Sequence, residues 1–282
     1  KYFFDEDGRI QNIYDFDVKK KNIILLGDSQ VEALMVENEN VIHNSLYREI
    51  NGKYNVLNYG LSGTGPSQQL EILKTKVDLK NIDTLIHFVF LENDLNDGDP
   101  KNFNEINRPK VYYKFKNFEN YEIIKPRVYN IKEKIRDFLG HFELYVYLKK
   151  TFYFYSSHIS NFFKEKREVV KVLVNDKKYI LDNEEYKWTQ LEGSIYQINK
   201  IAKKMSFKYK IIIFSTFEDD GYLKNREKFQ VFLNKQNISH SNIAPFLKQL
   251  SSKQKIDFSC DGHWNENTHQ AIAKYLKKEL KL

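Results

Sequence analysis

The sequence predicts an α/β protein in which helices cover both faces of a parallel sheet. Two features point to this fold: short apolar runs rich in β-branched or aromatic residues, and helical patterns that separate one run from the next. Hydrophobic residues make up 41% of the 282 positions, which is enough for a packed core. We therefore expect one globular domain.

Predicted strands and helices alternate along the chain. Strands are predicted at residues 22–27, 54–58, 84–91 and 209–215, where turn residues bound each apolar run. Helices are predicted at residues 41–50, 67–77, 184–206, 226–235 and 265–280. Because the carboxyl ends of parallel strands meet at one edge of a sheet, functional loops are expected there.

Residues 96–183 interrupt this alternation. They include a basic, aromatic stretch at residues 131–166 with a helical pattern. No linker rich in Gly, Ser or Pro bounds the segment, so we predict a mainly helical, aromatic-rich insertion packed on a core of residues 20–95 and 184–282. Its aromatic side chains fit either buried packing or a lid or membrane-facing surface.

Charge and hydropathy narrow the classes of partner. The 45 Lys and Arg against 38 Asp and Glu give a net charge of +7, but the basic residues are spread along the chain and form no nucleic-acid-binding motif, so specific nucleic-acid binding is not expected. An anionic glycan or membrane surface fits this charge better. The sequence has no apolar run of about 18 residues, the length that would predict a membrane span. The start at Lys1 without a signal peptide fits a mature or trimmed form that has lost an N-terminal anchor.

The first predicted strand runs into Gly27, Asp28 and Ser29, and a helix-compatible segment follows. A serine at a strand-to-helix turn has its hydroxyl at the carboxyl edge of the sheet, where the N–H groups of the helix N-terminus favour an oxyanion. The structural alternative is a serine that only caps the helix. The triplet by itself leaves both interpretations open.

Two further strand ends carry possible oxyanion donors. The second strand ends in NYGLSGTGPS, where the N–H of Gly60 could serve, although an ordinary strand-to-helix turn explains the glycines equally well. The third strand ends in LENDLND, where the amide of Asn93 could donate; in isolation such an Asn is more often a turn or cap residue.

A carboxylate and an imidazole stand together near the C-terminus. Asp261 precedes His263 by two residues, just before an amphipathic helix, and together they could supply the base and its orienting carboxylate for a serine nucleophile. His269 is interpreted as a surface or packing residue. The single cysteine, Cys260, excludes an internal disulfide and fits a small core residue better than a catalytic thiol.

These four segments, taken in chain order, resemble the blocks of the SGNH (GDSL-like) hydrolase superfamily, which carry Ser, Gly, Asn and His. The matching stretches are GDSQVEAL, NYGLSG, LENDLND and DGHWNENTHQAIA. The resemblance covers the predicted core and leaves the insertion unaccounted for. It implies a flavodoxin-like fold with three α/β/α layers.

The resemblance also implies a role for each matching residue. Ser29 would be the nucleophile, and Asp261 with His263 would complete the catalytic triad. The oxyanion hole would comprise the Ser29 N–H, the Gly60 N–H and the Asn93 side chain. Neither a cofactor nor a metal is expected, because the other histidines have no carboxylate or cysteine at ligand spacing.

The chain departs from the family pattern at three places. Ala33 stands where the first block often has glycine, and Glu92 replaces a glycine of the third block. A carboxylate near the oxyanion would oppose its charge, so we expect the Glu92 side chain to face solvent. Asp261 and His263 form Asp-x-His rather than Asp-x-x-His, a form found in envelope-associated and polysaccharide-modifying members.

Three functions follow from the resemblance. The first is an esterase that removes acetyl or another short acyl group from a carbohydrate, so that its partner is a small-molecule or glycan ester. The second is an O-acetyltransferase that acts on a cell-envelope polysaccharide with the same triad, and the third is a non-catalytic glycan-binding module. The resemblance favours the cell envelope or periplasm over the cytoplasm, with membrane association through a lost anchor or the aromatic insertion.

Overall fold

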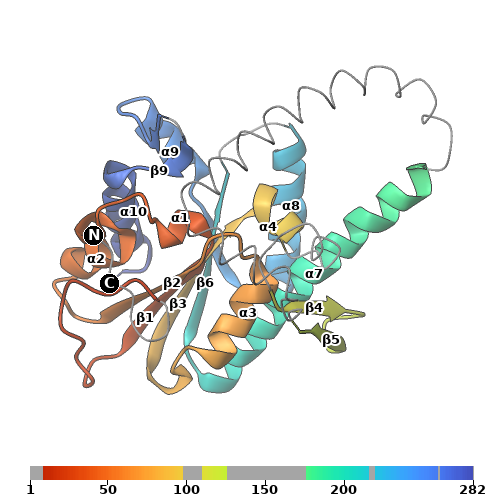
Figure 1. Ribbon diagram of the computed structural model, residues 1–282, viewed down its shortest axis with the longest axis horizontal. Coiled ribbons are helices and arrows are strands. Elements are labelled where there is room, and N and C mark those ends of the chain that lie inside the picture. Colours follow the sequence, from red (N-terminus) through yellow and green to blue (C-terminus); the bar gives the residue numbers. More distant parts are fainter. Residues whose placement is uncertain (1–8, 98–109, 126–175, 216–219, 260, 282) are drawn as a thin grey trace, which may run out of the picture.

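A five-stranded parallel sheet forms the centre of the molecule (Figure 1). The computed structural model describes residues 9–97, 110–125, 176–215, 220–259 and 261–281. The strands lie in the order β2-β1-β3-β6-β7, and every pair is parallel. Their bounds are β1 Asn22–Gly27, β2 Asn55–Gly60, β3 Ile82–Phe90, β6 Lys208–Phe214 and β7 Ser239–Asn242. This is the doubly wound 2-1-3-4-5 order, in which the connections change direction between β1 and β3.

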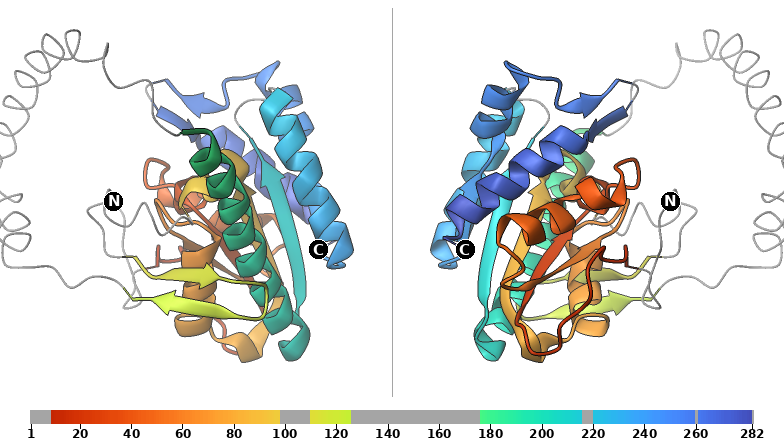
Figure 2. Two further views of the ribbon diagram at one scale, coloured as in Figure 1. Left: turned by 90° about the vertical axis from the view of Figure 1, so that its right-hand side faces the viewer. Right: turned by 90° about the vertical axis from the view of Figure 1, so that its left-hand side faces the viewer.

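Helices cover both faces of this sheet and make three layers (Figure 2). One face carries α3 (Pro66–Thr75), α7 (Asp176–Met205) and α8 (Asp220–Lys235). The other face carries α2 (Ile42–Glu49), α9 (Ala244–Ser251) and α10 (Glu266–Glu279). The short helices are α1 (Ser29–Glu32), α4 (Leu91–Asp97), η1 (Asn38–Asn40) and η2 (Leu79–Asn81). The prediction of an α/β fold with a parallel sheet between two helical layers is confirmed.

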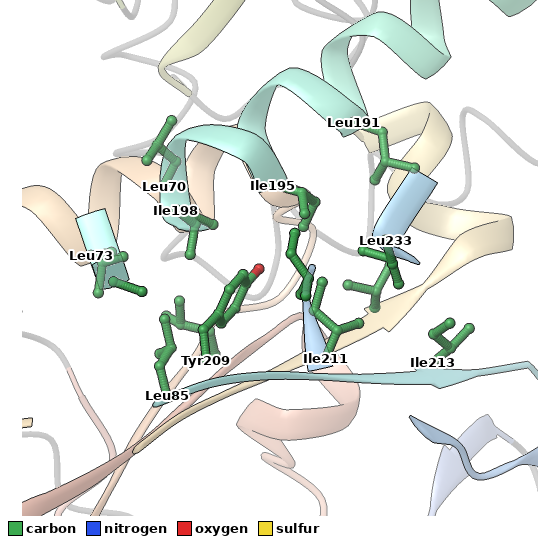
Figure 3. Packing of buried hydrophobic residues seen from close by; sticks show 14 of the residues in the cluster. Leu70, Leu73, Leu85, Leu191, Ile195, Ile198, Tyr209, Ile211, Ile213 and Leu233 are labelled. Atoms are coloured by element: carbon green, nitrogen blue, oxygen red, sulfur yellow. The ribbon is translucent and has the colours of Figure 1, made fainter. Parts of the chain in front are cut away.

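Alternate residues of the central strands supply the two halves of the core. In β1, Ile24 and Leu26 pack with the α7 side, whereas Ile23 and Leu25 pack with the α10 side. Strands of a sheet covered on both faces are therefore apolar at consecutive positions, which is the run seen in the sequence. Figure 3 shows Ile198 of α7 pointing toward Tyr209 of β6 in the first of these clusters.

A β-hairpin lies outside the main sheet and packs on α7. Its strands are β4 (Tyr112–Phe115) and β5 (Tyr121–Ile124). The Phe115 N–H donates to Gln190 Oε1 at 2.8 Å, and a Cβ on Gly193 would lie about 2.5 Å from the Phe115 ring. This described part of the predicted insertion is thus a hairpin seated on the core. Residues 131–166, with their packing and lid alternatives, and Cys260 lie outside the described residues.

The second small sheet pairs β8 (Asp257–Phe258) with β9 (Asp261–Trp264) next to the start of α10. Across the described ranges, no helix combines the length and apolar character that a membrane crossing requires.

Candidate active site

Ser29 lies where β1 turns into α1, at the carboxyl edge of the sheet. Asp28 caps the helix, and its Oδ1 accepts the Gln30 N–H at 2.9 Å. The helix packs closely on the strand ends: a Cβ on Gly60 would lie within 3.0 Å of the backbone of Val31 and Glu32. Ser29 is therefore held at the switch point between β1 and β3, where ligands bind in open α/β sheets.

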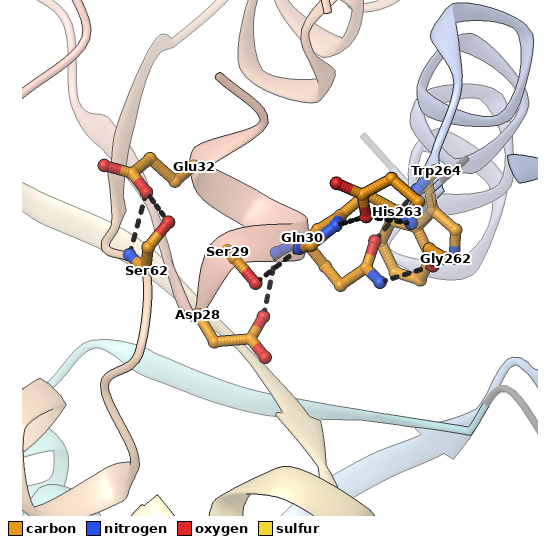
Figure 4. Close-up of polar contacts among 9 residues, drawn as sticks. Asp28, Ser29, Gln30, Glu32, Ser62, Gly262, His263 and Trp264 are labelled. Atoms are coloured by element: carbon orange, nitrogen blue, oxygen red, sulfur yellow. Dashed lines mark hydrogen bonds and ion pairs between the residues drawn. The ribbon is translucent and has the colours of Figure 1, made fainter. Parts of the chain in front are cut away.

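The imidazole of His263 reaches Ser29 from β9 (Figure 4). His263 Nε2 lies 2.7 Å from Ser29 Oγ, and His263 Nδ1 hydrogen-bonds Asp261 Oδ1. This bond from His263 holds the pKa of Asp261 below its usual range. In a strand, residues two apart face the same side, which explains how the Asp-x-His spacing brings both side chains together. The structure thus joins the three residues that the sequence proposed as a triad.

Gln30 is a site residue that the sequence analysis missed. Its side chain is buried, and its amide binds the backbone on both sides of His263: Nε2 donates to Gly262 O at 3.1 Å, and Oε1 accepts the Trp264 N–H at 3.0 Å (Figure 4). These two hydrogen bonds hold β9 against α1. They connect residues more than 230 positions apart, so local sequence patterns hold no signal of the contact.

The two glycines of NYGLSG lie in different surroundings. The Gly60 N–H donates to Asn58 Oδ1 at 2.8 Å, and Gly60 does not line the pocket at Ser29. Gly63 does line this pocket, and its φ of +67° requires the left-handed region that favours glycine. Lys110 Nζ donates to Gly63 O, and no described residue accepts the Gly63 N–H. The oxyanion role expected for Gly60 does not fit this geometry, because its N–H already has an acceptor within the strand.

Ser62, the neighbour of Gly63, is held by Glu32 at the end of α1. Glu32 Oε2 accepts the Ser62 N–H at 2.8 Å and also the Ser62 hydroxyl (Figure 4). Because Glu32 belongs to the helix of Ser29 and Ser62 belongs to the loop after β2, this contact fixes the glycine loop relative to Ser29.

Asn93 belongs to α4, which begins directly after β3. It lines the same pocket as Ser29, and its Nδ2 donates to Asp28 Oδ2 at 3.2 Å. Burial raises the pKa of Asp28, while the bonds from the Gln30 N–H and Asn93 lower it. Burial also raises the pKa of Asp97, whereas the charge of Lys110 and the hydrogen bond from Asn93 act to lower it. The Asp28 carboxylate therefore ties the helix of the nucleophile to that of Asn93.

The expectation that Glu92 faces solvent is wrong. Glu92 Oε1 accepts a hydrogen bond from Ser215 Oγ, just beyond β6, and Oε2 is buried. Glu92 is not among the residues that line the pocket. A polar partner in the protein, and not water, therefore binds the Glu92 carboxylate.

A pocket of about 420 Å³ opens at Ser29 and His263. Part of its lining is made by small or polar residues: Ser29, Gln30, Ser62, Gly63, Asn93, Asp97 and His263. The other lining residues are Ala33, Leu34, Met35, Val36, Trp264 and His269. Of the two interpretations of His269, packing is confirmed, because its ring is buried and meets the edge of Trp264 at 5.9 Å between centroids.

Comparisons with protein-family models and with curated proteins gave no match. Among solved structures, a lipolytic protein of the G-D-S-L family from Desulfitobacterium hafniense matches with 11% identity and a TM-score of 0.49, over 92% of this chain and 98% of its own. The esterase EstA from Pseudoalteromonas sp. matches with 13% identity and a TM-score of 0.49, over 93% and 100%. An acetylxylan esterase from Geobacillus stearothermophilus matches with 10% identity and a TM-score of 0.45, over 93% and 94%.

At identities this low, the role of each residue depends on the contacts around Ser29. One such contact explains a departure from the SGNH pattern: Ala33, where the first block often has glycine, ends α1 with φ 55° and ψ 45°. An alanine can adopt this left-handed conformation only at an energetic cost, which is why glycine suits the position.

Proposed function

We propose that the protein is a serine-dependent ester hydrolase that works through an acyl-enzyme on Ser29. The observation that carries this proposal is the 2.7 Å contact between Ser29 Oγ and His263 Nε2, with Asp261 hydrogen-bonded to the opposite ring nitrogen. A hydroxyl, a base and an orienting carboxylate in this order form the activated-nucleophile arrangement of serine hydrolases. A glycan-binding module would have no need of this alignment.

Each step of ester cleavage has a group positioned for it. His263 Nε2 takes the proton of Ser29 Oγ as this oxygen attacks the ester carbonyl, and Asp261 stabilises the imidazolium that forms. His263 then gives the proton to the leaving alcohol. In the second half, His263 activates a water molecule, which releases the acid and restores Ser29.

The oxyanion of the tetrahedral intermediate requires preorganised donors. We assign them to the Ser29 N–H at the start of α1, the Gly63 N–H and the Asn93 amide. The first two N–H groups have no acceptor among the described residues, and all three residues line the pocket. Gly63 thereby replaces Gly60 in the set expected from the sequence.

The resemblance to SGNH hydrolases implies acetyl or another short acyl group on a carbohydrate as the substrate. An O-acetyltransferase would form the same acyl-enzyme and pass the group to a glycan hydroxyl instead of to water. Product analysis with and without an added glycan acceptor separates the two outcomes, since only transfer consumes the acceptor.

Mass spectrometry after incubation with p-nitrophenyl acetate or butyrate tests the mechanism. The wild type should gain the mass of one acyl group on Ser29 and release p-nitrophenol, whereas Ser29→Ala should show neither and keep its fold by circular dichroism. An adduct on another residue, or undiminished turnover by Ser29→Ala, would overturn the proposal.

A further inference from the structure

The pocket at Ser29 has an apolar wall that ester cleavage itself does not require. The wall is built by the turn after α1, where the Val36 N–H donates to Ala33 O at 3.0 Å. Ala33 and Val36 are buried, while the two residues between them, Leu34 and Met35, are 42% and 54% exposed. The turn therefore presents two large apolar side chains at the surface beside the nucleophile.

Adjacent exposed apolar side chains that line a pocket are typical of ligand-binding sites. Two ring side chains also line this pocket: the indole of Trp264 is 2% exposed and packs against His269. Burial lowers the pKa of His269 to about 3, so its ring is neutral at physiological pH. The turn and these rings together give the pocket an uncharged, mainly apolar part of its lining.

The position of His263 decides which half of an ester would occupy this space. Its Nε2 must protonate the leaving oxygen, so the alcohol departs on the side of His263. Figure 4 shows Glu32, the last residue of α1, and His263 on opposite sides of Ser29. The apolar turn continues from Glu32, so its wall begins on the side away from the leaving alcohol.

We propose that Leu34 and Met35 bind the acyl chain of the ester, and that this chain is aliphatic and longer than acetyl, with about four to eight carbons. The cavity of about 420 Å³ is of the size that holds small molecules, far more than the methyl of an acetyl group fills. This inference rests on the proposed function at Ser29, and it extends the short acyl group expected from the sequence.

The first test is the dependence of kcat/KM on chain length for wild-type protein with p-nitrophenyl acetate, butyrate, hexanoate and octanoate. Each added methylene should raise kcat/KM about threefold to fourfold until the pocket is full, the factor expected for burial of one methylene. A second series, of alkyl acetates with lengthening alcohols, should show no such rise. A flat acyl series, or a rise confined to the alcohol series, would overturn the inference.

The second test changes the wall. Met35→Gln keeps the length of the side chain but makes it polar, so the ratio of kcat/KM for octanoate to that for acetate should fall about tenfold. Val231→Gln is the matched control, because Val231 is 68% exposed on α8, away from the pocket, and its ratio should equal that of the wild type. An unchanged ratio in Met35→Gln would contradict the assignment.

Failure of this inference is distinguishable from failure of the proposed function. If no ester acylates Ser29, the hydrolase proposal fails and the chain-length inference falls with it. If acetate is hydrolysed through Ser29 as fast as the longer esters, the hydrolase proposal stands and only the acyl-chain assignment is wrong.

Discussion

Gln30 follows the nucleophile in the sequence and hydrogen-bonds the backbone on both sides of the base. Its amide holds Gly262 O and the Trp264 N–H, the two backbone groups that flank His263. We interpret it as a positioning residue. A shift of about 1 Å between reacting groups can lower a rate by roughly 10²-fold, so this fastening should matter for kcat.

Gln30→Leu should lower kcat about 10-fold to 100-fold and leave KM for a small ester nearly unchanged, because it releases β9 without altering the pocket's apolar wall. The unpaired backbone groups should also lower the free energy of unfolding by about 1–3 kcal/mol. Steady-state kinetics and urea denaturation measure the two effects. Gln30→Glu keeps an acceptor for the Trp264 N–H and should lie between wild type and Gln30→Leu.

The control for this prediction is Gln270→Leu, which removes a glutamine amide that donates to Asn40 at 2.8 Å, away from the triad. It should leave kcat as in the wild type. Equal losses of kcat in the two leucine variants would show that the Gln30 bonds serve stability alone.

Ala33→Gly should raise the free energy of unfolding by up to about 1 kcal/mol. The substitution relieves the left-handed conformation at φ 55°, which costs an L-residue about 1–2 kcal/mol, against about 0.5–1 kcal/mol of added chain entropy. Ala273→Gly, in the buried interior of α10, should instead destabilise by about 1 kcal/mol or more. Thermal denaturation of both variants decides, and a similar loss in each would contradict the strained turn.

At the residue scale, the sequence predicted what depends on local spacing. Ser29, Asp261 and His263, which the structure brings into contact, stand out in the sequence because a strand-to-helix turn and an Asp-x-His strand each need only neighbouring residues. The choice between Gly60 and Gly63 depends on backbone angles and on the Asn58 side chain, which no residue pattern reveals. Glu92 was placed in solvent because its partner, Ser215, lies 123 residues away.

At the scale of elements, α1 and the end of β2 lie so close that only glycine fits between them. In Gly60→Ala, the new Cβ would meet the Glu32 nitrogen and Val31 carbon within 3.0 Å, and backbone atoms cannot rotate away as a side chain can. We expect the helix of Ser29 to be displaced, with a loss of about 1–3 kcal/mol in stability and of 10-fold or more in kcat.

Gly262→Ala is the matched control for stability, since a Cβ there would have no atom within 4 Å. Its unfolding midpoint in urea should equal that of the wild type. If Gly60→Ala also keeps the wild-type midpoint and kcat, the close contact between α1 and β2 is not present in solution.

The strands that sequence patterns predicted are buried apolar runs, and the strands that these patterns missed are not. β1, β2, β3 and β6 are apolar runs buried between helices, and their predicted bounds agree to about two residues. β7 reads SHSN, so it has no apolar run to detect. The hairpin β4–β5 was missed because it lies in a segment interpreted as helical. Its aromatic residues are buried against α7 and not against a second sheet, so they do not produce the alternating pattern typical of a strand.

At the scale of the whole molecule, the candidate active site lies where the strand order of the sheet reverses. The connections reverse between β1 and β3, and the residues that follow these two strands, Ser29 and Asn93, are bridged by Asp28. Alternation of strands and helices predicted the layers and the functional edge. β8 and β9, the pair that carries His263, are two and four residues long, too short to produce a periodic signal in the sequence.

Three buried histidines should make stability depend on pH. Burial lowers the pKa of His43, His87 and His269 to about 3, from an ordinary value of 6.5. Between these values the unfolded chain binds protons that the folded protein does not, so stability is lost as pH falls from about 6.5 toward 3. Each histidine should contribute a loss of up to about 1.4 kcal/mol per pH unit. Burial raises the pKa of Asp28, Asp94 and Asp97, so these carboxyls oppose the loss at the acid end.

A variant isolates one histidine from these opposing groups. His87 hydrogen-bonds Tyr209 at 2.9 Å and also Gln69, and His87→Gln retains polar atoms for both partners. The difference in free energy of unfolding between wild type and His87→Gln should be constant from pH 8 to 7. It should shift by about 2 kcal/mol against the wild type by pH 5, as the unfolded wild type takes up one more proton than the variant. Urea denaturation at each pH measures this difference. Parallel curves down to pH 5 would mean that His87 accepts a proton within the folded core, and the buried, neutral state assigned to it would be wrong.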